Sequence, residues 1–73
     1  MPFNPSAFRE LRDEVGVNQI GFAELLDISQ SLVSFFERGE KRPSLETLDR
    51  IYTLARSRGY DNLIFYVPPE IKR

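Results

Sequence analysis

The chain has 73 residues and a formal net charge of −1, from 10 lysine and arginine residues against 11 aspartate and glutamate residues. A globule of this size buries only about 60% of its unfolded surface, so its core is marginal and association with a second copy would add stability. The absence of cysteine and histidine excludes disulfides, thiol nucleophiles, histidine acid/base chemistry and zinc clusters. No apolar run approaches the roughly 20 residues of a membrane span, so we expect a cytoplasmic protein without a membrane partner, metal or cofactor.

Residues 4–15 have the pattern of a first helix. Asn4 is suited to the N-cap, Pro5 is tolerated at the first helical position, and Gly16 favours the end of the helix. The apolar residues of its buried stripe are Phe8, Leu11 and Val15. A second helix is predicted to start after Asn18, and its apolar residues are Phe22, Leu25 and Leu26.

The central part of the chain predicts two further helices. Ser29 can cap a third helix that runs to about Arg38. Residues 39–43, GEKRP, then form a turn by composition, and Ser44 caps a fourth helix that ends near Gly59. The apolar residues of these helices are Val33 and Phe36 in the third and Leu45, Leu48, Ile51, Tyr52 and Ala55 in the fourth.

The final residues, 60–73, differ from the helical part in composition. They contain a continuous β-branched and aromatic run, which favours a strand and comprises Leu63, Ile64, Phe65, Tyr66 and Val67. A lone strand leaves its backbone groups unpaired, so we expect it to pair with the same strand of a second copy. The alternative is a short fifth helix capped by Asp61. Residues 1–59 are thus predicted to form one domain, and residues 60–73 a dimerisation segment.

The second and third predicted helices are short and joined by a tight turn, as in domains that place a helix in the DNA major groove. The stretch NQIGFAELLDISQSLVSFFERGEKRPSLETL resembles the helix-turn-helix of the phage repressor, Cro and Xre family, and with its flanking helices the resemblance covers about residues 7–58. The matching positions are Arg12, Asn18, Gln19, Ala23, Leu26, Ile28, Ser29, Val33, Ser34, Glu37, Gly39, Pro43 and Leu48.

This resemblance implies an all-α, compact four- to five-helix domain similar to lambda repressor, to which a short C-terminal strand pairing across a dimer could be added. It also implies a structural ion pair between Arg12 on the first helix and Glu37 at the end of the third. The side chain of Gln19 is expected to brace that of Gln30, again by resemblance.

A helical wheel separates the two faces of the third helix. At about 100° per residue, Val33 and Phe36 share the buried side, with Glu37 at its margin. The outward residues, predicted to contact bases, are Gln30, Ser31, Ser34 and Phe35. Gln can bond an adenine edge with two hydrogen bonds, and an apolar ring can contact a thymine methyl group. The alternative for Phe35, where relatives more often carry a polar or basic residue, is packing against a neighbouring helix or a protein partner.

Contacts to DNA phosphates are predicted from two places. The backbone N–H of Gln19 lies near a helix N-terminus, which favours anions. Arg38, Lys41 and Arg42 form a basic cluster in which Glu40 is the only opposing charge. The alternative for this cluster is a charged turn that is merely solvated.

The leading hypothesis is a bacterial or phage transcriptional regulator that binds double-stranded DNA, as a homodimeric repressor reading a palindromic operator with half-sites about 34–36 Å apart. The alternative is the antitoxin of a toxin–antitoxin pair, since HipB-like antitoxins resemble this layout, bind a toxin and repress their own operon. An interaction domain that has lost DNA binding is a further alternative, favoured by Phe35 and the near-neutral charge. An enzyme is not expected, because no nucleophile and base stand out and no glycine-rich phosphate loop is present.

Overall fold

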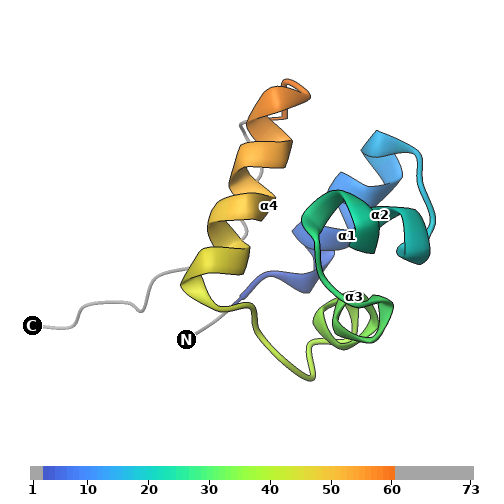
Figure 1. The fold of residues 1–73 in the computed structure, drawn as a ribbon, viewed down its shortest axis with the longest axis vertical. Coiled ribbons are helices and arrows are strands. Elements are labelled where there is room, and N and C mark those ends of the chain that lie inside the picture. Colours follow the sequence, from blue (N-terminus) through green and yellow to red (C-terminus); the bar gives the residue numbers. More distant parts are fainter. Residues whose placement is uncertain (1–2, 61–73) are drawn as a thin grey trace, which may run out of the picture.

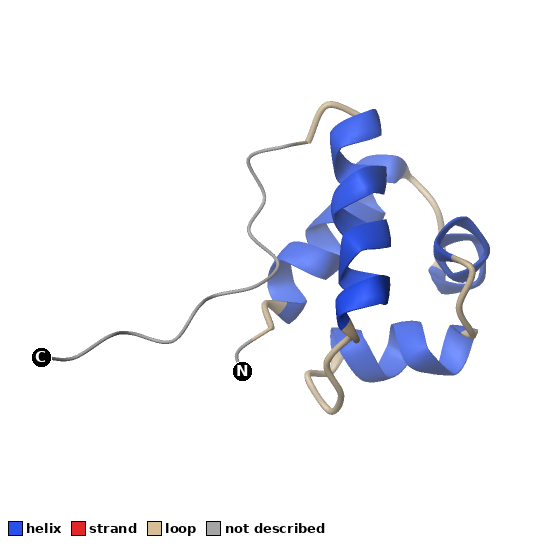
Figure 2. Cartoon of the chain, turned by 60° about the vertical axis from the view of Figure 1, so that its left-hand side comes forward, coloured by secondary structure: helices blue, strands red, loops and turns tan. Residues whose placement is uncertain are grey.

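The computed structural model describes residues 3–60, which form four α-helices. They are α1 (Pro5–Val15), α2 (Gln19–Leu26), α3 (Gln30–Glu37) and α4 (Leu45–Ser57). Figure 1 shows α3 end-on at the edge of the molecule, and Figure 2 shows it lengthwise below the other helices. The all-α class is confirmed. The predicted strand over residues 63–67, with its alternative, a fifth helix, lies outside the described residues.

Each of the four helices begins at the side chain predicted to cap it. The side-chain oxygens of these caps accept a hydrogen bond from the backbone N–H three residues further on, in the pairs Asn4 and Ala7, Asn18 and Gly21, Ser29 and Leu32, and Ser44 and Thr47. Such a bond satisfies one of the N–H groups that the first turn of a helix leaves without an internal partner. The caps therefore set the register of all four helices, and with it the residues that face inward.

The turn between α2 and α3 is built around a non-glycine residue in the left-handed region. Asp27 has φ 58° and ψ 46°, and the backbone N–H of Ile28 returns to the carbonyl of Ala23 at 3.0 Å. Arg50 reaches this turn from α4 and donates to the carbonyls of Leu26 and Asp27 at 3.4 and 3.3 Å. An arginine of α4 thus satisfies the carbonyl end of α2, a role that the sequence analysis did not anticipate.

Asp27→Gly should stabilise the domain. The left-handed conformation costs a residue with a Cβ about 1–2 kcal/mol, and glycine avoids this cost. Glycine also raises the conformational entropy of the unfolded chain, which offsets part of the stabilisation. We expect a net gain of about 0.5–1 kcal/mol in the free energy of unfolding, measured by urea titration. Asp27→Ala keeps the Cβ and should bring no such gain, so equal stabilisation by both variants would contradict the explanation.

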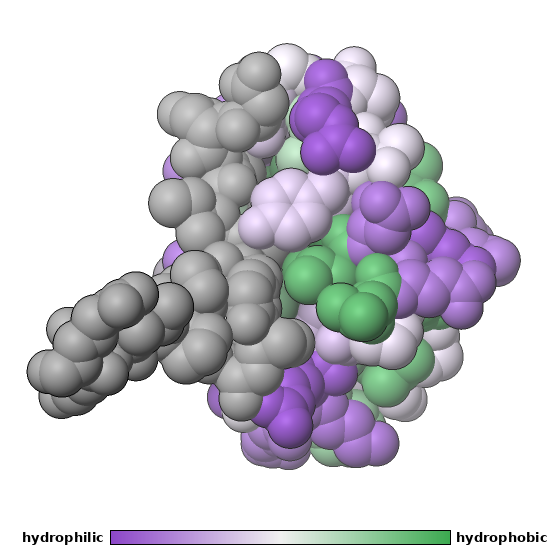
Figure 3. Space-filling view, turned by 90° about the vertical axis from the view of Figure 1, so that its left-hand side faces the viewer, coloured by the Kyte–Doolittle hydropathy of each residue, from purple (hydrophilic) through white to green (hydrophobic). Residues whose placement is uncertain are grey.

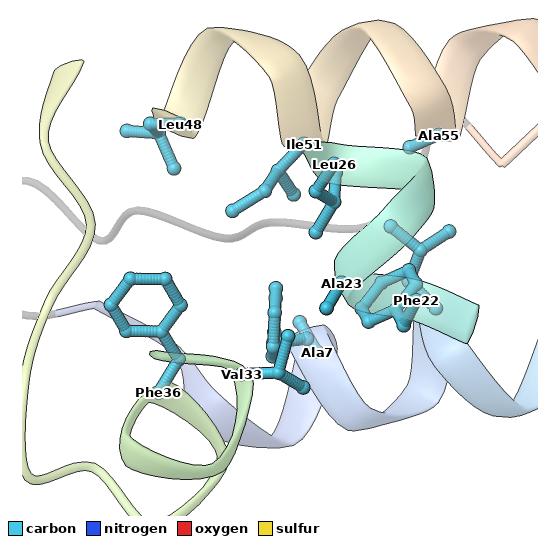
Figure 4. Close-up of a cluster of buried hydrophobic side chains, with 11 residues drawn as sticks. Ala7, Phe22, Ala23, Leu26, Val33, Phe36, Leu48, Ile51 and Ala55 are labelled. Carbon is cyan, nitrogen blue, oxygen red and sulfur yellow. The ribbon is translucent and has the colours of Figure 1, made fainter. Parts of the chain in front are cut away.

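The core lies where the four helices meet, and it contains three phenylalanine side chains. Phe8 is fully buried, and its ring centroid lies 5.0 Å from that of Phe22 and 5.7 Å from that of Phe36. Figure 4 shows Phe36 of α3 pointing toward Leu48 and Ile51 of α4. The buried hydrophobic residues are Ala7, Phe8, Leu11, Phe22, Ala23, Leu26, Val33, Phe36, Leu48, Ile51 and Ala55. One face of α3 is thereby fixed to the rest of the domain.

Two predicted stripe residues lie outside this core. Leu25 is 45% exposed and Leu45 is 78% exposed, so the predicted stripes of α2 and α4 were too wide. Leu26 already takes the buried position beside Leu25, and Leu45 is the first residue of α4, one turn before the buried Leu48. On the face shown in Figure 3, a small group of hydrophobic side chains lies at the surface, with hydrophilic side chains along part of its border. Some apolar side chains therefore remain at the surface.

Candidate nucleic-acid interface

The two faces of α3 differ as the helical wheel predicts. Val33 and Phe36 are buried on the inner side, packed with α1 and α4 residues of the core. On the outer side, Gln30 and Ser31 are exposed, and Ser34 and Phe35 are half-buried. These four residues, which the sequence analysis assigned to base contacts, line one open hollow together with Arg38. The hollow places amide, hydroxyl, aromatic and guanidinium groups next to one another on a single helix.

Phe35 is held at the surface by two cations. The guanidinium carbon of Arg38 lies 5.1 Å from the centre of its ring, and Nζ of Lys41 lies 4.7 Å from it. A cation over a ring face is attracted by the negative charge of that face. The ring therefore has local partners on α3 and the following turn, and within residues 3–60 it is not part of the buried core. Phe35 keeps an apolar surface beside Ser31 and Ser34.

A hydrogen-bonded network connects α1, α2 and α3 behind this face. Both carboxylate oxygens of Glu37, a residue only 8% exposed, accept hydrogen bonds from Arg12, at 2.6 Å from Nε and 3.2 Å from Nη2. Gln19 donates to the same carboxylate at 3.1 Å, and its side-chain oxygen accepts from Nε2 of Gln30 at 3.5 Å. The hydrogen bond to Glu37 raises the pKa of the Arg12 guanidinium. The buried carboxylate thus anchors a chain of polar contacts that ends at an exposed side chain of α3.

Glu37, predicted at the margin of the buried side and paired with Arg12, makes this ion pair and is itself buried. Burial of a carboxylate requires charge-assisted partners, and Arg12 and Gln19 supply three hydrogen bonds. Arg12 is fixed in turn by a hydrogen bond from its Nη1 to the carbonyl of Val17 at 3.3 Å. The ion pair therefore holds the end of α3 against α1 and the loop that precedes α2.

Two of the predicted phosphate contacts, Arg38 and Lys41, lie at the outer face of α3, where both cations lie over the Phe35 ring. Lys41 and Arg42 are exposed in the turn before α4. Arg38, which is also exposed, donates to both carboxylate oxygens of Glu40, at 2.9 and 3.2 Å, and to the hydroxyl of Ser34. This contact raises the pKa of Arg38 and lowers that of Glu40. Glu40, the opposing charge of the basic cluster, thus forms an ion pair with Arg38.

Ile20 was missed by the sequence analysis. It is 55% exposed at the start of α2 and lines a second open hollow with Arg12, Asn18, Gln19 and Gln30. At 100° per residue, Ile20 lies about 160° from Phe22 but only about 60° from the buried Ala23, so the helical wheel places it at the margin of the buried side and does not by itself predict its exposure. An apolar side chain therefore adjoins the outward polar residues from the neighbouring helix.

A short helix that supports a second helix with an outward polar face, beside a basic turn, defines a helix-turn-helix DNA-binding domain. The comparison with protein families agrees: the model of a helix-turn-helix family of the Cro/C1/Xre type matches residues 8–51. The match spans more than half of the chain, and the chain belongs to this family of DNA-binding regulators. No curated protein and no solved structure gave a significant match.

Over the described part of the chain, no α-helix combines the length and the apolar character that a membrane span requires. Within residues 3–60, no group of three or more carboxylate side chains is placed to hold a metal ion.

Proposed function

We propose that the protein is a sequence-specific transcriptional repressor that binds a palindromic operator as a homodimer, with α3 in the major groove. The observation that supports this is the division of α3 into two faces. Its inner face is fixed in the core by Val33 and Phe36, and its outer face carries the hollow lined by Gln30, Ser31, Ser34, Phe35 and Arg38. A helix held rigidly on one side can present its other side to base edges in a fixed register.

Gln30 is the base contact with the clearest chemistry. One N–H of its amide is donated to Gln19, which leaves the second N–H and the carbonyl oxygen of the side chain for a base. That pair of groups matches N6 and N7 of adenine. Phe35 can add an apolar contact to a thymine methyl group, and the hydroxyls of Ser31 and Ser34 can donate or accept. The face therefore favours A·T base pairs in the half-site.

Phosphate contacts position the helix but do not read sequence. The side chain of Gln19 is engaged by Glu37 and Gln30, so its contact to a phosphate is assigned to the backbone N–H at the first position of α2. Lys41 and Arg42 flank the other end of α3 and are assigned as side-chain clamps. This small number of contacts, together with a net charge of −1, gives one protomer a weak affinity for DNA.

Dimerisation doubles these contacts. A dimer of this fold class reads two half-sites about 34–36 Å apart, or a multiple of that distance, on one side of the duplex. The proposed contact between protomers is the segment Leu63, Ile64, Phe65, Tyr66 and Val67, because its β-branched and aromatic composition favours a strand that can pair with its copy. Residues 3–60 carry no observation that favours the antitoxin alternative over a stand-alone repressor.

The proposal is tested by selection of bound duplexes from a pool of random DNA. A dimeric repressor should enrich two inverted half-sites at constant spacing, with A·T pairs prominent in each. Enrichment of a single half-site would contradict the dimer while retaining the DNA-binding function. If no sequence is enriched at low salt, the proposed function is wrong.

A further inference from the structure

The end of α3 fixes the backbone of Glu40 close to the outer face of the helix. The N–H of Glu40 donates to the carbonyl of Phe35 at 2.9 Å, and the N–H of Gly39 donates to that of Phe36 at 3.1 Å. Gly39 has φ +73°. This pair of bonds around a left-handed glycine is the Schellman motif, which closes the last turn of a helix. Glu40 therefore cannot move away from α3 without opening the end of the helix.

The carboxylate of Glu40 binds the Nε–Nη2 edge of the Arg38 guanidinium, the edge that can also bind another anion with two hydrogen bonds. Its two oxygens accept from Nε and Nη2 of Arg38 at 2.9 and 3.2 Å, and Nη1 donates to Ser34. Three of the five N–H donors of the guanidinium are thus in use. The two parallel bonds on the Nε–Nη2 side have the geometry with which arginine would bind a phosphate.

We propose that Glu40 withholds Arg38 from the DNA phosphates and so lowers the affinity of the protein for DNA of any sequence. This inference rests on the proposed DNA-binding function. An arginine neutralised by a carboxylate releases no counterion from the duplex, so it contributes nothing to the salt dependence of binding. A phosphate that displaced Glu40 would still meet its charge, because the backbone of Glu40 is fixed at the end of α3.

The consequence is a DNA-binding surface with fewer active cations than its sequence contains. The side-chain clamps proposed above are Lys41 and Arg42, whereas Arg38 lies over Phe35 and donates to Ser34 within the protein. Low sequence-independent affinity leaves more of a regulator free to find its own site among the many competing sites of a genome. Glu40 would then determine specificity without contacting a base.

The test is Glu40→Gln in the full chain, with binding to a duplex of random sequence measured between 50 and 200 mM salt. Glutamine keeps the size of the side chain and removes its charge. The variant should bind more tightly, and its log–log salt slope should be steeper by about 0.9 per protomer. Its advantage over the parent should then be about threefold to fourfold larger at 50 mM than at 200 mM salt for one bound protomer, and about twelvefold larger for a bound dimer. Circular dichroism of the parent and variant should coincide, because both side chains of the pair are about half exposed.

Two controls isolate Arg38 as the cause. Arg38→Ala should leave the salt slope of the parent nearly unchanged. In the double variant Arg38→Ala with Glu40→Gln the slope should not steepen, because no guanidinium is released to neutralise a phosphate. Glu46→Gln removes a carboxylate from another exposed arginine pair, Glu46 with Arg50 at 3.2 Å, and should change the slope much less. An effect of charge alone would give the same increase in both glutamine variants and would overturn the inference.

The remaining outcomes also decide between explanations. An unchanged slope in Glu40→Gln, or weaker binding, would overturn the inference, because weaker binding would mean that Glu40 orients Arg38 for a productive contact. These results are distinguishable from failure of the proposed function: in that case the parent chain itself shows no duplex binding at 50 mM salt, and the inference falls with it.

Discussion

Replacement of Phe8 by alanine should leave most of the protein unfolded at 25 °C. The side chain is fully buried, and its ring lies within 5.7 Å, centroid to centroid, of three other phenylalanine rings. Removal of a buried phenylalanine costs about 3–5 kcal/mol, from lost burial and from the cavity left behind. A core of this size supplies only about 3–5 kcal/mol of stability in total, so the substitution removes nearly all of it.

The measurement is urea unfolding followed by far-ultraviolet circular dichroism, with Phe35→Ala as the matched control. Phe35 has the same side chain but is half-buried and lies outside the core, so its loss should cost less than about 1 kcal/mol. Similar losses of stability in the two variants would mean that the core is not centred on Phe8.

Glu37→Ala should have the next largest effect, on stability and on DNA binding together. The substitution leaves the Arg12 guanidinium, whose side chain is only 22% exposed, and the Gln19 amide without their shared partner. Loss of one member of a buried ion pair costs about 3–5 kcal/mol. Because Arg12 is partly exposed, we expect a smaller loss of about 2–3 kcal/mol here. The affinity of the folded variant for DNA should also fall, because Gln19 no longer holds Gln30 in place.

A double variant separates the effect of Glu37 on stability from its effect on DNA recognition. Arg12→Met combined with Glu37→Leu removes both charges, and replacement of a buried pair by apolar residues is often nearly neutral. We therefore expect its unfolding free energy to exceed that of Glu37→Ala, while its DNA affinity stays low, since Gln19 is still unanchored. If affinity returned with stability, the contact from Glu37 through Gln19 to Gln30 would have no role in recognition.

Much of the fold follows from short-range rules that the sequence displays. Asn4, Asn18, Ser29 and Ser44 each begin a helix, since a side-chain oxygen there meets the N–H groups of the first turn. The different faces of Phe35 and Phe36, about 100° apart, follow from helical geometry alone. These features depend on neighbours within one helical turn, which is why no knowledge of tertiary structure is needed to predict them.

The features that were missed depend on contacts between distant parts of the chain. Arg50 lies 23 residues from Asp27, so no local pattern shows that it satisfies the end of α2. The exposure of Leu25 and Leu45 depends on how far each helix reaches into the shared core. For the candidate site, the types of residue on α3 were predictable. The pairing of Arg38 with Glu40 is an exception to the rule of distant contacts, because the two residues are neighbours at the end of α3 and were missed for their side-chain conformations alone.

The central claim, that the outer face of α3 reads base edges, is tested most directly by the DNA selection repeated with Gln30→Ala. A dimer that uses Gln30 against adenine should lose its preference at one base pair in each half-site, where the parent discriminates by about 1–3 kcal/mol, and should keep its preferences elsewhere. An unchanged preference at every position, or a uniform loss of affinity across all sequences, would show that α3 does not read DNA in this way.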